Sequence, residues 1–129
     1  MKLDRIIKLL QAVALVDFIN PAEEITEVCG ADLMSDVLRF SSGSGLLITG
    51  LTNVHAIRTA EMSGISCIVY VCGKTPAAEV TAEAGELGIT LLSTEYAFFE
   101  TCGILYSEGF NNPLRAKKDH SESEDKFSV

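Results

Sequence analysis

Three consecutive strand–helix units constrain the fold of this chain more than any other feature of its sequence. Each unit begins with a short, almost wholly apolar segment and continues with a turn and a segment of helical length. The units place strands over 45–50, 66–73 and 89–94, and helices over 53–63, 76–87 and 95–108. Apolar strands that alternate with helices are typical of a parallel sheet covered on both faces. Gly64, Gly88 and Gly109 stand where the three helices should end.

The residues before these units predict two more helices and two more strands. A first helix is marked by apolar residues at helical spacing: Leu3, Ile6, Ile7 and Leu10. Residues 12–16 suit a short strand and residues 24–32 a longer one, after which Asp32 or Ser35 can cap a short helix. The whole pattern predicts an α/β fold of three layers, with a largely parallel sheet, helices on both faces and right-handed crossovers.

The composition narrows the class of partner and the location. A chain of 129 residues is long enough for one domain with a buried core. The formal net charge is -8, which argues against nucleic acid and against an anionic membrane surface as partners. Charged and polar residues interrupt the apolar stretch in residues 1–16 at helical spacing, so we expect neither a signal peptide nor a membrane span. We therefore expect a cytoplasmic protein.

The last segment of the chain differs from the rest, because residues 111–129 show no helical or strand period. Ordering their backbone would cost on the order of 20–40 kcal/mol in conformational entropy. Burying their few apolar side chains would return less than about 10 kcal/mol. We therefore predict a folded domain over 1–110 and a disordered acidic and polar tail over 111–129.

The chain has four cysteines, and no two of them form a Cys-x-x-Cys pair: Cys29, Cys67, Cys72 and Cys102. Cys67 and Cys72 are five residues apart on one predicted strand, so they should point to opposite faces. Free cysteine packs as a small hydrophobe in reducing compartments. We therefore predict buried, reduced thiols.

One predicted strand runs into the tripeptide Gly-Lys-Thr at 73–75, the end of the common phosphate-binding P-loop signature. That signature needs a first glycine five residues before Gly73, and Ile68 stands there. Pro76 removes one N–H from the first turn of the next helix, and Glu79 adds a negative charge near it. We therefore expect no P-loop and no kinase activity.

The ligand crevice of an open parallel sheet lies beyond the carboxyl ends of its strands, which here are the loops at 50–55, 73–76 and 93–95. An anion is favoured at the helix that starts near Asn53, because first-turn N–H groups are unpaired and this turn has no acid. Lys74 reaches the same crevice if its strand lies beside the preceding one. The candidate ligand-binding residues are Gly50, Thr52, Asn53, His55, Arg58 and Lys74.

A bound anion would favour protonated His55, so affinity should fall as the pH rises from about 6 to about 8. The alternative is structural: Asn53 only caps its helix, and His55, Arg58 and Lys74 are solvated surface residues.

Two further constellations are weaker. Asp32, Asp36 and His55 offer ligands for a divalent metal, and Cys72 with His55 offers a nucleophile and a base, but both sets come from unlinked segments. We predict no metal site and no catalytic residues, and the sequence identifies no cofactor.

Four aromatic residues cluster over the last predicted helix: Tyr96, Phe98, Phe99 and Tyr106. They are mainly core residues, but so many apolar positions on one helix leave some of them on the surface. We expect these to form a contact between copies and therefore predict a homodimer.

Four segments of the chain resemble a known domain family: ADLMSDVL (31–38), LLITG (46–50), IVYVCGKTP (68–76) and LLSTEYAFFETCGILY (91–106). Over roughly residues 2–110 the chain resembles the DRTGG domain in its small stand-alone form. Relatives of that domain are associated with the N-terminal half of HPr kinase/phosphorylase, and occur between the CBS domains of family II pyrophosphatases and in some phosphotransacetylases. The chain lacks the Asp-Arg-Thr-Gly-Gly stretch for which the family is named, and has Gly-Leu-Thr-Asn at 50–53 in the corresponding position.

This resemblance implies an HPr-kinase N-terminal-domain-like fold and a regulatory or dimerising module without established catalysis. We therefore expect a non-catalytic, ligand-sensing DRTGG module that dimerises and binds a small anionic ligand, nucleotide or phosphate, or a partner enzyme. The alternatives are a small phosphoryl-transfer or hydrolytic enzyme and a purely structural assembly subunit. The sequence names neither the ligand nor the partner nor the pathway.

Overall fold

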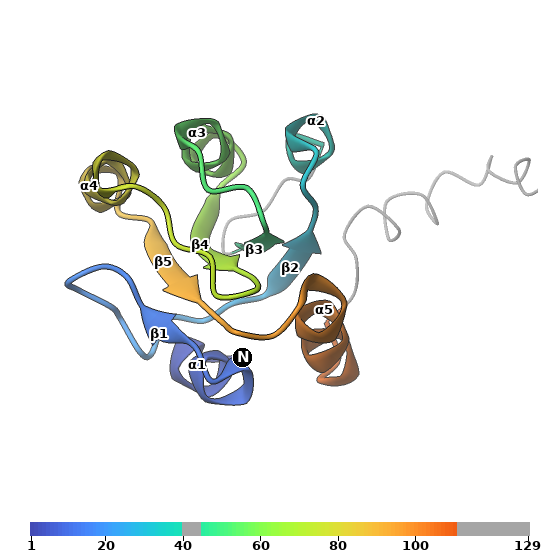
Figure 1. Ribbon diagram of the computed structural model, residues 1–129. Coiled ribbons are helices and arrows are strands. Elements are labelled where there is room, and N and C mark those ends of the chain that lie inside the picture. Colours follow the sequence, from blue (N-terminus) through green and yellow to red (C-terminus); the bar gives the residue numbers. More distant parts are fainter. Residues whose placement is uncertain (40–44, 111–129) are drawn as a thin grey trace, which may run out of the picture.

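The computed structural model describes residues 1–39 and 45–110 (Figure 1). The tail predicted over 111–129 lies outside these residues.

Within the described residues, five strands form one sheet in the order β1-β5-β4-β3-β2. Four of them run parallel, and only β1 pairs antiparallel, with β5. The strands are β1 (Val13–Ala14), β2 (Glu27–Gly30), β3 (Gly45–Thr49), β4 (Ile65–Tyr70) and β5 (Thr90–Ser93). The prediction of an α/β fold with a largely parallel sheet is therefore confirmed.

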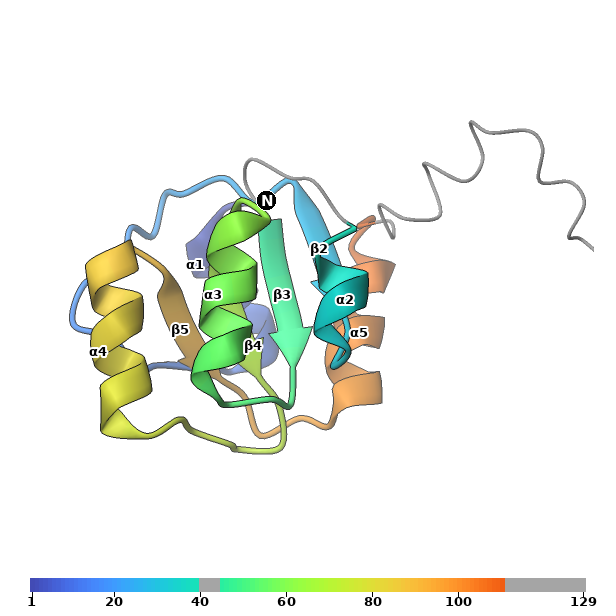
Figure 2. The same ribbon diagram turned by 90° about the horizontal axis from the view of Figure 1, so that it is seen from above.

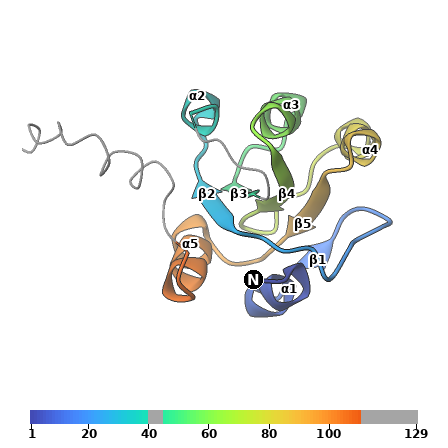
Figure 3. The ribbon, with the colours of Figure 1, turned by 180° about the vertical axis from the view of Figure 1, so that it is seen from behind.

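Helices cover both faces of the sheet, as predicted (Figures 1 and 3). The helices are α1 (Leu3–Leu10), α2 (Met34–Val37), α3 (Val54–Met62), α4 (Ala78–Leu87) and α5 (Phe98–Ser107). Because β2 to β5 lie in sequence order across the sheet, right-handed crossovers put α2, α3 and α4 on the same face, where they lie side by side (Figure 2). The chain changes face only before β2 and after β5, so α1 and α5 share the other face.

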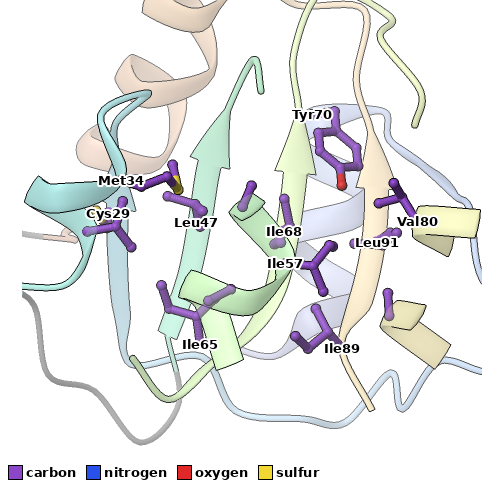
Figure 4. Packing of buried hydrophobic residues seen from close by; sticks show 14 residues of the cluster. Cys29, Met34, Leu47, Ile57, Ile65, Ile68, Tyr70, Val80, Ile89 and Leu91 are labelled. Carbon is purple, nitrogen blue, oxygen red and sulfur yellow. The ribbon is translucent and has the colours of Figure 1, made fainter. Parts of the chain in front are cut away.

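The three strands β3, β4 and β5 are mostly apolar because both of their faces are buried. On one face, Leu47, Ile68 and Leu91 pack with Ile57 of α3 and Val80 of α4 (Figure 4). Alternate strand residues point the other way. These residues pack with α1 and α5; they are Leu46, Ile48, Val69 and Leu92.

Several predicted boundaries and caps need correction. The strand predicted over 24–32 is shorter at both ends, because β2 spans only Glu27–Gly30. The prediction that Asp32 or Ser35 caps the next helix is wrong, because α2 begins after Leu33 without a side-chain cap. The glycines predicted to end three helices do have positive φ: Gly64, Gly88 and Gly109.

The cysteine prediction is right for the core and wrong for one residue. Cys29 and Cys67 are buried, and burial raises the pKa of both thiols, that of Cys29 to about 12. Cys102 is half-buried. Cys72 is exposed, because β4 ends at Tyr70 and the chain turns there with Cys72 at φ 59°. Cys67 and Cys72 therefore do not share a strand.

Candidate functional site

The carboxyl ends of β3 and β4 meet, because these two strands pair in parallel. Lys74, in the loop after β4, extends over the end of β3, where its Nζ donates to the Gly50 carbonyl oxygen at 3.3 Å. Lys74 was expected to reach this crevice if β4 lies beside β3, and it does. The ammonium group lies beside the loop that leads into α3.

The start of α3 has the predicted cap. Asn53 is the N-cap residue, and its side-chain oxygen accepts from the Ala56 N–H at 3.1 Å. The first turn of α3 has no acidic residue. Asn53 and His55 are exposed, and Thr52 is half-buried. These residues and Gly50 belong to one continuous, solvent-facing segment.

The structure does not bring Arg58 to this group. Its Nε lies 3.0 Å from a Glu83 carboxylate oxygen, so the side chain reaches across to α4. The Arg58 side chain is 62% exposed, and exposed ion pairs contribute about 1 kcal/mol or less. Arg58 therefore serves first as a link between α3 and α4.

Asp32, which was considered as a helix cap and as a metal ligand, also lies at this edge of the sheet. One of its carboxylate oxygens accepts from the Thr49 hydroxyl and from the Gly50 N–H, both at 2.8 Å. A Cβ built on Gly50 would lie 3.4 Å from Lys74 Nζ and 3.8 Å from both Asp32 oxygens. An acid and a base therefore flank Gly50. Strand order could have indicated this position, because Asp32 follows β2, and β2 is the neighbour of β3 in the sheet.

The loop after β4 is tied to the loop after β5. The Cys72 N–H donates to the Tyr96 carbonyl at 2.9 Å, and the Gly73 N–H donates to the Thr94 carbonyl at 2.8 Å. The Lys74 N–H donates to the Val71 carbonyl at 3.1 Å. The backbone N–H groups of residues 72–74, two of which belong to Gly-Lys-Thr, thus donate to carbonyl oxygens of the chain itself and do not converge on an anion.

Glu95 makes this side of the edge acidic. Its carboxylate packs so closely on Gly73 that a Cβ there would lie 2.8 Å from both oxygens. The edge therefore has a positive charge at Lys74, with the Asp32 carboxylate on the other side of Gly50, and a second negative charge at Glu95. An anion would meet the favourable side only at the end of β3.

Two cavities lie elsewhere. One, of about 450 Å³, lies between β2 and α5. The other, of about 590 Å³, lies between residues 15–23 and α4. None of the candidate residues lines either of these two cavities.

The remaining findings concern metal ligands and membrane spans in residues 1–39 and 45–110. In this part of the chain no three histidine, cysteine, aspartate or glutamate side chains group as metal ligands, and Asp32, Asp36 and His55 form no such set. No helix there has the length and apolar character needed to cross a membrane.

Comparison with known proteins identifies a similar fold. No family model matches the chain, and no curated protein matches it. A crystal structure of the CBS and DRTGG domains from the regulatory region of Clostridium perfringens pyrophosphatase, complexed with the activator diadenosine tetraphosphate, is similar with a TM-score of 0.61. The similarity covers 80% of this chain at 21% identity, and 45% of that chain's length. The fold is DRTGG-like.

Proposed function

We propose that this chain is a regulatory module that senses a small anionic ligand, a nucleotide or phosphate, without catalysing a reaction, and that it works as a homodimer. The observation that carries the proposal is the position of Lys74, whose ammonium group lies on the Gly50 carbonyl beside the start of α3. The ligand would bind there, at the carboxyl end of β3.

Electrostatics favours an anion at this position over the other helix starts. The N-terminus of an α-helix carries about half a positive charge on its unpaired N–H groups. Lys74 adds a full charge next to it, and the first turn of α3 has no acid. By contrast, α4 has Glu79 in its first turn and α5 has Glu100.

Asp32 gives the site a mechanism for sensing. Its carboxylate holds the Gly50 N–H, a donor that an anionic ligand would use. An anion that takes this donor displaces a like charge, and Asp32 stands two residues before α2. Ligand binding would therefore be linked to the position of α2, which is the kind of coupling that a regulatory module needs.

The structural comparison supports the choice of ligand class to test first. The pyrophosphatase region with a similar fold was crystallised with a dinucleotide activator that carries several phosphates. A phosphate-bearing nucleotide suits the pairing of Lys74 with a helix start in this chain.

Lys74→Ala is expected to weaken nucleotide binding about tenfold or more, because a charge-assisted hydrogen bond contributes roughly 1.5–3 kcal/mol. Asp32→Asn keeps an oxygen acceptor for Thr49 and Gly50 but removes the competing charge, so it should strengthen binding several-fold. Calorimetric titration with ATP, diadenosine tetraphosphate and inorganic phosphate, at about pH 6 and about pH 8, measures both effects and the predicted loss of affinity at the higher pH.

Lys8→Ala is the matched control, because Lys8 is an exposed lysine on α1, on the opposite face of the sheet. It should bind as the wild type does. Equal affinities for wild type and Lys74→Ala would refute the proposed site, and so would tighter binding to Lys74→Ala.

The same protein is expected to show no magnesium-dependent ATP turnover, because the backbone donors of Gly73 and Lys74 are engaged within the chain. A coupled assay for ADP release measures this. Turnover that disappears in Lys74→Ala, with an unchanged circular dichroism spectrum, would favour the alternative function, a small phosphoryl-transfer or hydrolytic enzyme.

A further inference from the structure

One side of α5 carries an uncharged stripe at helical spacing. Phe99, Cys102, Gly103 and Tyr106 stand at i, i+3, i+4 and i+7, so they share a side of the helix. We call these four residues the α5 stripe. The stripe borders the 450 Å³ groove, whose remaining lining comes from the edge strand β2, from β3 and from the end of the domain: Val28, Gly30, Ile48 and Phe110.

The large side chains of the stripe face solvent. Phe99 is 87% exposed and Tyr106 is 60% exposed. Since a fully buried aromatic side chain removes about 150–250 Å² from water, these two alone expose on the order of 300 Å². A stable interface of standard size buries about 800 Å² on each partner. The two aromatics therefore supply more than a third of that area before the rest of the groove is counted.

Gly103 lies between the two aromatics, and packing within the described chain does not require a glycine at this position. A Cβ built on it meets no described atom within 4 Å. Glycine weakens the middle of a helix relative to alanine. Its missing side chain makes a low point at the centre of the stripe, where the backbone of another helix can approach closely.

The charge of the chain favours a second copy at this surface. Two copies with a formal net charge of -8 each repel one another, so a contact between them is favoured where acids are absent. None of the eight groove residues is charged. The groove lies at the β2 edge of the sheet, beside α5 (Figures 1 and 3).

We propose that the α5 stripe packs against the same stripe of a second copy about a two-fold axis that passes near Gly103. A two-fold axis across the helix makes the two α5 helices antiparallel and the contact self-complementary. Phe99 and Tyr106 are nearly equidistant from Gly103 in sequence. Phe99 of one copy therefore lies against Tyr106 of the other, and the two Gly103 residues face each other. The inference rests on the homodimer in the proposed function and names its surface, but it does not depend on the ligand site.

A cysteine placed on a two-fold axis meets its own copy, which gives a direct test. In a Cys72→Ser/Cys102→Ala background, which removes the exposed thiol and the thiol that already lies in the stripe, Gly103→Cys should form a disulfide-linked dimer of about 28 kDa under mild oxidation, twice the 13.9 kDa of one chain. Gly85→Cys is the matched control, because Gly85 lies inside α4 and a Cβ there also meets nothing within 4 Å. It should stay monomeric on a non-reducing gel.

Light scattering of the full chain at tens of micromolar protein gives an independent readout. The wild type and Gly85→Arg should show the dimer mass, and Gly103→Arg should show the monomer mass. The dissociation constant of the Gly103→Arg dimer should be at least about a hundredfold higher than that of the wild type, and its circular dichroism spectrum should be unchanged. Nucleotide titration of Gly103→Arg should give the wild-type affinity, which separates the surface from the ligand site.

Three outcomes would overturn the inference. A monomeric wild type would remove the dimer itself. A wild-type dimer that Gly103→Arg leaves intact would place the contact elsewhere and assign the groove to another occupant. Equal cross-linking of Gly103→Cys and Gly85→Cys would mean that chance collisions, and not a two-fold contact, join the chains.

Discussion

Tyr70→Ala is expected to lower the free energy of unfolding by about 3–5 kcal/mol, the range for removing a large aromatic side chain from a core. Tyr70 is fully buried at the end of β4, with its ring between the sheet and the layer of α3 and α4 (Figure 4). Among the residues that the structure describes, none hydrogen-bonds its hydroxyl. Tyr70→Phe should therefore leave the free energy of unfolding unchanged or raise it by up to about 1 kcal/mol.

Alkaline pH separates the hydroxyl from the ring. Burial raises the pKa of Tyr70 from its ordinary value of 10.0 to about 12. Because the folded-state pKa is the higher one, the contribution of the neutral hydroxyl is complete below pH 10 and is lost as the pH rises through about 12. The stability of Tyr70→Phe should therefore fall less over this interval than that of the wild type.

Urea unfolding at one fixed protein concentration measures both Tyr70 variants, since oligomerisation makes apparent stability depend on concentration. A loss of more than about 1 kcal/mol in Tyr70→Phe would mean that the hydroxyl has a stabilising partner. A loss of less than about 1 kcal/mol in Tyr70→Ala would mean that the ring does not fill the core as described.

Gly30→Ala is expected to cost about 1–3 kcal/mol through overpacking. A Cβ at this position in β2 would lie 2.7 Å from the Cys102 sulfur and 3.5 Å from the Phe98 ring. Cys102→Ala should relieve this overpacking, because it removes the sulfur that a Cβ at position 30 would meet. The double variant Gly30→Ala/Cys102→Ala should therefore be more stable than the sum of the two single effects predicts.

A double-mutant cycle in urea measures this coupling, which should exceed about 0.5 kcal/mol. Gly85→Ala is the control, because its Cβ would meet nothing, and alanine there should match or exceed the stability of glycine by up to about 1 kcal/mol. Additive effects of Gly30→Ala and Cys102→Ala would show that α5 shifts freely away from β2.

The end of β2 joins the two surfaces proposed for this chain. Gly30 lines the groove beside α5, and Asp32, two residues later, holds the Gly50 N–H at the candidate ligand site. Changes at Gly30 should therefore be assessed for ligand affinity as well as for stability.

The sequence alone determined the class and order of the elements. The apolar strands around Leu47, Ile68 and Leu91 require cover on both faces, because no alternating polar residues face water. That requirement leads to a largely parallel α/β sheet. Helix ends were also predictable, because a positive φ strongly favours glycine, as at Gly88.

Two features of the candidate site could also be predicted from the sequence, the cap of α3 and the approach of Lys74 to Gly50. Thr52 or Asn53 was predicted as the cap of this helix, and the cap is Asn53. A cap can be predicted from sequence because it depends only on the next three residues. The approach of Lys74 to Gly50 was predicted on one condition, the pairing of β3 with β4, which a local pattern leaves open.

Only the tertiary structure decided which polar groups meet. Asp32 binds Gly50 instead of capping α2, and Arg58 binds Glu83. Cys72 is exposed because β4 ends two residues before it. Sequence spacing fixes the face on which a side chain lies, but the partner of an exposed polar group depends on which strand ends and helices are neighbours. That arrangement is set by strand order and by the packing of both core layers.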